Sequence, residues 1–309
     1  MGCSLQWADR VQGTGLEQEV LPERHAVKPI HQSGYLYSNF HNPLTKLTQD
    51  VKDVGEFVDP GHWQGYSTEG HPDLLTRELT NVQFSVKVDR PDLTYHDGHT
   101  FLDQMAKEIG PNREWADEHF EERVGGTPMN PDPSYERWPW WNGQDVSKQA
   151  DEGKFTHTYS ERFWPKYAGE GDDGPYRTFE GRHNFGIRYE YGDVADLCFL
   201  LRREKYTRQA YLPIFFPEDT GANHSGRIPC TLGYHFLVRP DSDGIDRLDM
   251  WYFLRSCDVV RHFRDDVYLA VRLMLWVIDK CWTPGEVEPG TLHMTIPSLH
   301  IHMGDIHRV

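Results

Sequence analysis

Cysteine is scarce in this sequence and is not arranged for disulfides or zinc. The 309 residues contain five cysteines, an odd number, and no two of them form a Cys-x-x-Cys pair. Disulfide frameworks and zinc sites both depend on patterned cysteines. We therefore expect reduced thiols and a cytoplasmic protein. The cysteines lie at positions 3, 198, 230, 257 and 281.

Positive charge is also in short supply. The chain has 32 Lys and Arg against 48 Asp and Glu, and its formal net charge is −16. Proteins that bind nucleic acid need a basic surface for the phosphate backbone, so we expect no nucleic-acid partner. A few arginines at one site are still enough to bind a small phosphorylated ligand.

No apolar run is long enough to cross a bilayer. The longest, residues 267–278, is interrupted by Arg272, whereas a membrane-spanning helix needs about 20 apolar residues. The first residues lack the basic and apolar regions of a secretory signal. Gln6 stands where myristoylation needs Ser or Thr. We therefore expect no membrane partner.

Sustained patterning begins after about residue 75. Residues 1–75 are polar and rich in His, Gly and Pro, and we expect an irregular N-terminal extension there, followed by a folded domain over 76–309. Hydrophobic periodicity predicts helices over 100–109, 114–124, 191–203 and 259–280. Alternation predicts strands over 81–88, 209–216, 231–238, 248–254 and 293–302. This order is typical of an α+β fold with one large sheet.

Two polar groups stand out in the second half of the chain. Cys230 follows a proline at the start of a predicted strand, where a cysteine can simply be a small buried residue. Arg227 is close in sequence, however, and positive neighbours favour the reactive thiolate. Arg255 and Ser256 end another predicted strand, where they can bind a phosphate or form an ordinary surface ion pair.

Asp266 and the histidines near the end of the chain each allow both a structural and a functional explanation. Asp266 lies at the start of a predicted helix, where carboxylates commonly cap the N-terminus. The chain has 17 histidines. His300 and His302 share one face of a predicted strand and, with His307 beside Asp305, could form a metal site. A histidine-rich metal-binding protein is therefore an alternative from a different functional class.

Taken together, these segments resemble the thymidylate synthase superfamily, most closely its phage-type deoxycytidylate (dCMP) hydroxymethylase branch. The likeness covers roughly residues 114–305. It implies an α+β fold with a large mixed sheet flanked by helices, in which the sheet forms the interface of a homodimer and residues 76–309 are the catalytic domain. The matching segments are 155–162 (FTHTYSER), 207–210 (TRQA), 228–233 (IPCTLG), 255–259 (RSCDV), 262–266 (HFRDD) and 297–302 (PSLHIH).

The resemblance implies a pyrimidine nucleoside monophosphate as substrate. Cys230 matches the nucleophile that adds to C6 of the ring, so that C5 becomes able to attack an electrophile. Arg255, Ser256 and Arg208 match phosphate ligands, and Arg208 is expected to reach across the dimer interface. A catalytically idle relative would be free to lose Cys230, so its presence favours an enzyme.

The resemblance also implies a folate cofactor, 5,10-methylenetetrahydrofolate, and no metal. Asp258 matches a residue that holds the pterin, and Trp141, at the end of a proline-rich loop over 125–141, is a further candidate cofactor contact. His293 and His300 are candidate substrate contacts, with His293 expected at the sugar hydroxyl.

A general base and one more phosphate ligand are also expected. The base matches a glutamate on the helix before the proline-rich loop, where Glu118, Glu121 and Glu122 all qualify; the following segment favours Glu122. The additional phosphate-binding arginine remains open between Arg77 and Arg90.

Asp266 falls where thymidylate synthases carry an asparagine that reads uracil. An ionised carboxylate only accepts hydrogen bonds, so it suits the exocyclic amine of cytosine and a protonated N3. It also stabilises positive charge that develops on the ring during thiolate addition. We therefore expect a 5-hydroxymethyltransferase acting on dCMP or CMP. Thymidylate synthase and dUMP hydroxymethylase are the alternatives within the family.

Overall fold

The computed structural model describes residues 35–63, 66–89, 98–140, 150–151, 154–168, 191–220 and 227–309. Contacts join residues 34–309 into one unit. Trp141 and Arg90, both named above as candidates, lie outside the described residues.

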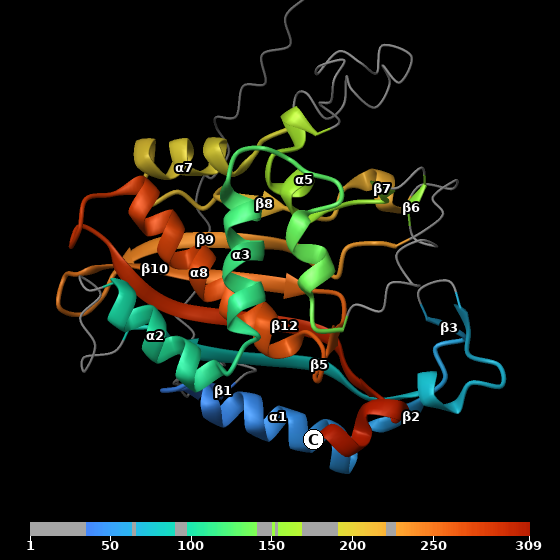
Figure 1. Ribbon diagram of the computed structural model, residues 1–309. Coiled ribbons are helices and arrows are strands. Elements are labelled where there is room, and N and C mark those ends of the chain that lie inside the picture. The colour runs from blue at the N-terminus through green and yellow to red at the C-terminus, as the bar shows by residue number, and fades with distance from the viewer. Residues whose placement is uncertain are drawn as a thin grey trace, which may run out of the picture. The chain divides into compact units, whose positions relative to one another are not determined.

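A mixed eight-stranded sheet organises this unit (Figure 1). The strand order is β1-β5-β12-β10-β9-β8, with β2 also paired to β5 and β11 to β12. Parallel pairs are β1–β5, β10–β12 and β11–β12, and the other pairs are antiparallel. The strands are β1 Tyr35–Tyr37, β2 Glu56–Val58, β5 Thr76–Lys87, β8 Tyr211–Pro213, β9 Thr231–Pro240, β10 Asp246–Leu254, β11 Cys257–Asp258 and β12 Glu288–His302.

Helices flank the sheet, and α2, α3 and α8 lie in front of it in Figure 1. The α-helices are α1 His41–Val54, α2 Gly98–Ile109, α3 Arg113–Val124, α5 Tyr159–Phe163, α7 Val194–Arg203 and α8 Phe263–Cys281. Short 3-10 helices are η1 Pro72–Leu74, η2 Pro133–Arg137, η3 Pro165–Tyr167, η5 Pro217–Thr220 and η6 Met303–Arg308. Two small hairpins pair β3 His62–Trp63 with β4 Tyr66–Ser67, and β6 Ala150–Asp151 with β7 Lys154–Phe155.

The core lies between α8 and one face of the sheet. On β10 every second residue is buried, from Leu248 to Leu254, as expected for a strand with one covered face. Twelve of the 19 residues of α8 are buried, and the Phe263 ring meets the Phe84 ring of β5 edge-on at 5.9 Å. This packing fixes the N-terminus of α8 against the sheet, and Asp266 lies in that first turn.

The structure confirms the coarse expectation of an α+β fold with a large mixed sheet flanked by helices. Residues 35–75 differ from the expected irregular extension, because they contain α1 and two strands that pair with β5. The burial of Phe40, Leu44 and Val51 explains the difference, since α1 covers part of the core with few residues. The strand expected at 209–216 is only the three residues of β8.

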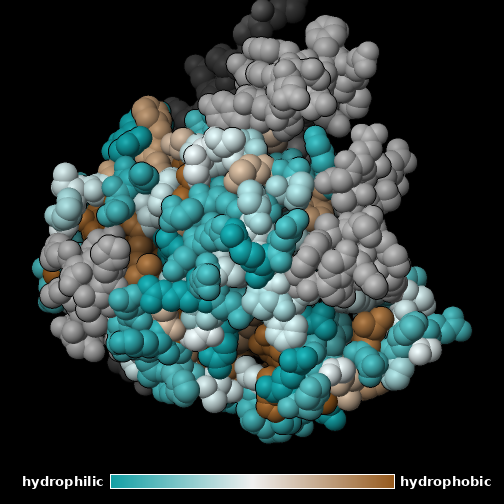
Figure 2. Space-filling view, in the orientation of Figure 1, coloured by the Kyte–Doolittle hydropathy of each residue, from teal (hydrophilic) through white to brown (hydrophobic). Residues whose placement is uncertain are grey.

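None of the helices in the described ranges is both long and apolar enough to span a membrane. On the side that carries α2, α3 and α8, the surface is mainly hydrophilic, with small separate apolar patches (Figure 2). This distribution agrees with the acidic composition of the chain.

Candidate functional site

Sheet register brings Cys230, Arg255 and Ser256 together. Thr231 at the start of β9 pairs with Leu254 at the end of the antiparallel β10. The residues just outside these two strands are therefore neighbours, and the Arg255 amide donates to the Cys230 carbonyl at 2.8 Å. Segments 25 residues apart in sequence meet at one end of the sheet as a direct result of the hairpin.

The Cys230 sulfur lies next to a cation and a hydroxyl. Arg255 Nη2 is 3.7 Å and Ser256 Oγ 3.8 Å from Sγ, both within reach of a sulfur hydrogen bond. Arg255 is held in place because its Nε and Nη2 donate to the carbonyls of Pro229 and Ile228 at 2.9 and 3.0 Å. Cys230 is only partly buried, so its sulfur combines access with a positioned positive charge.

Asp266 connects to the Cys230 region through a series of hydroxyl groups. The Tyr159 hydroxyl is 3.1 Å from Thr231 Oγ1, which is 2.8 Å from the Tyr252 hydroxyl. Tyr252 in turn donates to Asp266 Oδ1 at 3.4 Å, and Cys257 Sγ lies 3.5 Å from Oδ2. The series therefore links the Tyr159 hydroxyl to the Asp266 carboxyl group through hydrogen bonds.

The environment of this series shifts the pKa values of Tyr159, Tyr252 and Asp266 upward. Burial raises the pKa of Asp266 to about 6, although the positive charge of Arg123 opposes the shift. Burial, followed by the negative charges of Cys230 and Asp266, raises the pKa of Tyr159 above its usual value. Tyr159 therefore keeps its proton at neutral pH, whereas Asp266 loses its proton near pH 6.

Arg123 is a buried cation that sequence reasoning did not single out. Only 4% of the residue is exposed, and its guanidinium carbon lies 4.0 Å from the centre of the Tyr159 ring. No hydrogen-bond partner reaches its Nε from the described part of the chain. The cation–π contact and the nearby carboxylates stabilise this charge. Sequence gives little signal for it, because Arg123 lies among other charged residues on α3.

Among the three candidate glutamates, the structure separates Glu122 from the others. Glu118 pairs with Arg137 at the surface, and Glu121 is exposed and pairs with Arg272 at 2.7 Å. Glu122 is enclosed and accepts a hydrogen bond from the Ser134 amide at 2.7 Å.

Glu122 belongs to a buried acidic group with His119 and Asp132, whose potential ligand atoms lie within 4.8 Å of one another. Burial raises the pKa of Glu122, but hydrogen bonds from His119 and Ser134 outweigh it, so the pKa is lowered overall. Burial raises the pKa of Asp132 to about 7. Two carboxyl groups with diverging pKa values can serve as proton acceptor and proton carrier.

Asp258 and His300 pair directly in the parallel register between β11 and β12. His300 and His302 lie on the same face of β12, and their ring centres are 5.4 Å apart. The expectation that these two rings share a face is confirmed. Neither His307 nor Asp305, which pairs with Arg261 and Arg308, belongs to the group that His300 and His302 form among the described residues.

Other predicted site residues lie apart from this group. His293 pairs with Trp251 within the sheet and accepts or donates a 2.7 Å bond to Ser85 Oγ. It is seven residues before His300 on β12, which corresponds to about 23 Å along an extended strand. The two histidines therefore do not bind one small nucleotide together. Arg208 is exposed beside β9, and Arg77 donates to the Gly55 carbonyl at 3.3 Å.

Two cavities, of about 270 and 330 Å³, lie beside α7 and β8 and are lined by none of the residues around Cys230. Neither cavity contains the candidate site, which consists of the side chains around Cys230. No protein-family model matches the chain, and no curated protein matches it.

Proposed function

We propose that the protein is a cytidylate 5-hydroxymethyltransferase of the thymidylate synthase superfamily. It would transfer a one-carbon unit from 5,10-methylenetetrahydrofolate to C5 of dCMP or CMP, with addition of water. The observation that carries the proposal is the grouping of Cys230, Arg255 and Ser256 at the partly open end of the sheet.

These three residues support nucleophilic addition to a phosphorylated pyrimidine. The Cys230 thiolate forms a bond to C6, and C5 gains the electron pair that attacks the one-carbon unit. Arg255 keeps donors available for a phosphate, because only part of its guanidinium is used in its bonds to backbone carbonyls. After the new C5 bond has formed, loss of the C5 proton and elimination of the Cys230 thiolate from C6 restore the C5–C6 double bond.

Asp266 supports cytosine as the base. At pH 7 a carboxyl group with a pKa of about 6 is mainly ionised, and its two oxygens can accept bonds from the cytosine amine and a protonated N3. The hydroxyls of Tyr252, Thr231 and Tyr159 then connect this edge of the ring with the neighbourhood of the sulfur. Glu122 and Asp132 are the candidates for proton transfer at C5.

Folate supplies the one-carbon unit at the oxidation level of formaldehyde. Its proposed contacts are Asp258, which faces two histidines, and Trp141, which lies outside the described residues.

A homodimer through the face of the sheet opposite α8 is part of the proposal. Ring contacts connect Tyr211, His235, Phe253, Trp251 and His293 across β8, β9, β10 and β12. Tyr211 is 44% exposed, and these positions alternate with the residues buried under α8. A second copy of the chain would cover this aromatic face.

Arg208 fits the same arrangement. Its backbone carbonyl lies 3.0 Å from His235 Nε2, so the residue borders the aromatic face. The Arg208 side chain is exposed, which leaves it available to reach the phosphate site of a partner copy.

Product analysis tests the proposed function. The protein is incubated with dCMP, CMP or dUMP and methylenetetrahydrofolate, and products are measured by mass spectrometry. We expect a cytidylate heavier by one CH₂O, absent from the Cys230→Ser variant and retained in Cys281→Ala, which removes a buried sulfur on α8. Formation of dihydrofolate with dUMP would instead indicate a thymidylate synthase, and no product from any nucleotide would contradict the proposal.

A further inference from the structure

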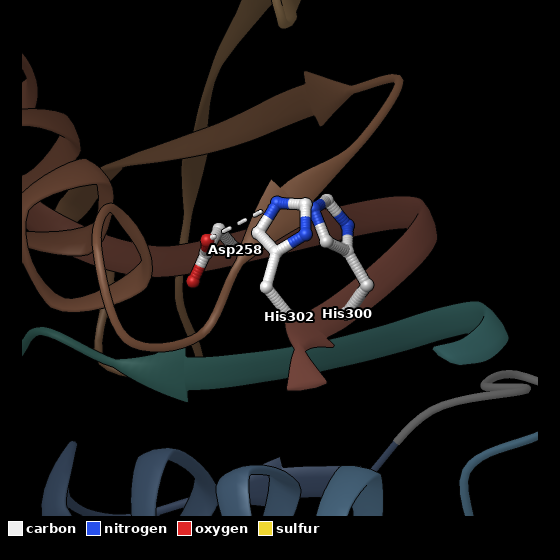
Figure 3. Close-up of side chains that lie close together, drawn as sticks. All are labelled: Asp258, His300 and His302. Carbon is white, nitrogen blue, oxygen red and sulfur yellow. Dashed lines mark ion pairs between the residues drawn. The ribbon is translucent and has the colours of Figure 1, made fainter. Parts of the chain in front are cut away.

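Asp258, His300 and His302 form a compact group at the end of β12 (Figure 3). One potential ligand atom from each residue lies within 4.8 Å of the other two. Asp258 is fixed by its Oδ1, which accepts hydrogen bonds from the amides of Val260 and Arg261 at 2.8 and 3.1 Å. The group is therefore anchored by backbone as well as by sheet register.

The second oxygen of Asp258 has no donor of its own. Asp258 is 5% exposed, and no hydrogen bond reaches Oδ2 from the residues that the structure describes. Among the described residues, Arg261 forms an ion pair with this oxygen, with its Nε 3.6 Å away. Arg261 already donates to Asp305 from both Nε and Nη2, at 2.9 and 2.7 Å. A buried carboxylate oxygen without a donor is costly, so a cation is expected here.

His302 turns a second acceptor toward the same space. Its Nδ1 is 3.2 Å from the Leu74 carbonyl. A carbonyl only accepts, so this nitrogen carries the proton, and in the neutral ring Nε2 holds a lone pair. Nε2 lies 3.9 Å from Asp258 Oδ2. A metal ion between two such acceptors can bind both of them. A ligating histidine usually donates its other ring nitrogen to a carboxylate, a backbone carbonyl or water, as Nδ1 does here.

We propose that Asp258 Oδ2, His302 Nε2 and a ring nitrogen of His300 bind a divalent first-row transition metal, most simply Zn²⁺. Imidazole and carboxylate are ligands that zinc and its neighbours accept. Three protein ligands leave a coordination position open, as in catalytic rather than structural zinc sites. Asp258 and His300 then hold the ion instead of the folate and nucleotide that the family resemblance gives them.

The second group of potential metal ligands already has hydrogen-bond partners for its side chains. It consists of the buried His119, Glu122 and Asp132. Ser134 Oγ lies 3.0 Å from His119 Nδ1 and its amide donates to Glu122, and Ser160 donates to Asp132 at 2.6 Å. Each of these three residues already has a hydrogen-bond partner within the protein. Of the two groups found among the described residues, the Asp258 group is the one that combines convergent ligands with an acceptor that lacks a hydrogen-bond donor.

Metal titration of the full chain without nucleotide tests the site. Chelator-treated protein is titrated with Zn²⁺ by calorimetry and with Co²⁺ by visible absorption. We expect one saturable equivalent, with affinity at least ~10-fold weaker in Asp258→Asn and in His300→Ala. His307→Ala, an exposed histidine on η6, is the matched control and should bind as the wild type does.

Three results would overturn the site: no saturable equivalent in the wild type, unchanged affinity in both ligand variants, or an equal loss in the His307 control. X-ray absorption of the Zn²⁺ form requires no variant; it should show N and O neighbours at about 2.0–2.2 Å, and a sulfur shell would exclude this group as the ligands. Covalent reaction of Cys230 with nucleotide is measured separately on metal-free protein, so either proposal can fail alone.

Discussion

Replacing Asp266 by asparagine perturbs the proposed base-recognition residue with almost no change in shape. The amide can still accept from Tyr252, which lies 3.4 Å from Oδ1, and it can still contact Cys257. What changes is the charge, and with it the ability of both terminal atoms to accept hydrogen bonds. The substitution therefore separates the effect of the buried charge from that of packing.

The expected change in stability follows from the pKa of Asp266. Burial raises this pKa to about 6, roughly two units above the usual value for aspartate, and each unit corresponds to about 1.4 kcal/mol. Between about pH 4 and pH 6 the folded protein holds a proton that the unfolded chain has lost, so the wild-type free energy of unfolding falls as pH rises. Above pH 6 the loss is complete, at about 3 kcal/mol.

Asp266→Asn cannot lose this proton. We expect the variant and the wild type to have equal free energies of unfolding below about pH 4, and the variant to be more stable by about 3 kcal/mol at pH 7. Urea denaturation at several pH values measures this difference. Asp279→Asn, an exposed position on the same helix, is the control and should change stability little at any pH.

The same variant tests base selection. An amide presents a donor where the carboxylate presented an acceptor, so the ratio of kcat/KM for dUMP over that for dCMP should rise by at least ~10-fold, equivalent to about 1.4 kcal/mol. A pH-independent stability difference would refute the reasoning about a buried, desolvated charge. A stability gain with unchanged selectivity would remove Asp266 from recognition of the base.

Substitutions also test three other proposed roles: anion binding, proton transfer and dimer formation. Arg255→Ala should slow product formation by about 10- to 100-fold in steady-state assays, because charge-assisted bonds to sulfur and phosphate are lost. Arg255→Lys should recover only part of the lost activity, because lysine lacks the planar guanidinium. Full activity in the alanine variant would contradict the anion-binding role. Glu122→Gln should lower kcat by about 10²- to 10⁴-fold, with exposed Glu121→Gln as the matched control; equal effects would reject Glu122 as the base. Trp251→Glu should convert a dimer into monomers in sedimentation experiments, and an unchanged dimer would place the interface elsewhere.

The sheet and its main helices could be predicted because their sequences follow the periodicity of the element. β10 alternates buried and accessible residues, and α8 carries its apolar residues at helical spacing. Residues 35–75 could not be predicted in this way. α1 buries only three residues of its own, Pro43, Leu44 and Val51, and short strands such as β1 and β2 gain their order from pairing with β5.

The part of the candidate site that could be predicted is the part in which strand pairing alone makes two residues neighbours. Cys230 and Arg255 flank paired strand ends, so their proximity follows from a hairpin. The same logic, applied to His293 and His300, shows why one strand cannot bring both to a single ligand. The buried charge of Arg123 and the donor-free oxygen of Asp258 depend on three-dimensional packing, which sequence spacing does not encode.

The most direct test of the central claim is covalent trapping of Cys230 with a 5-fluoro derivative of dCMP in the presence of methylenetetrahydrofolate. Fluorine at C5 cannot leave as a cation in place of the proton, so the bond between the sulfur and C6 should persist. Peptide mass spectrometry of the trapped protein is expected to find nucleotide and folate attached at Cys230 and nowhere else. Unmodified Cys230, or attachment at Cys257 instead, would contradict the account.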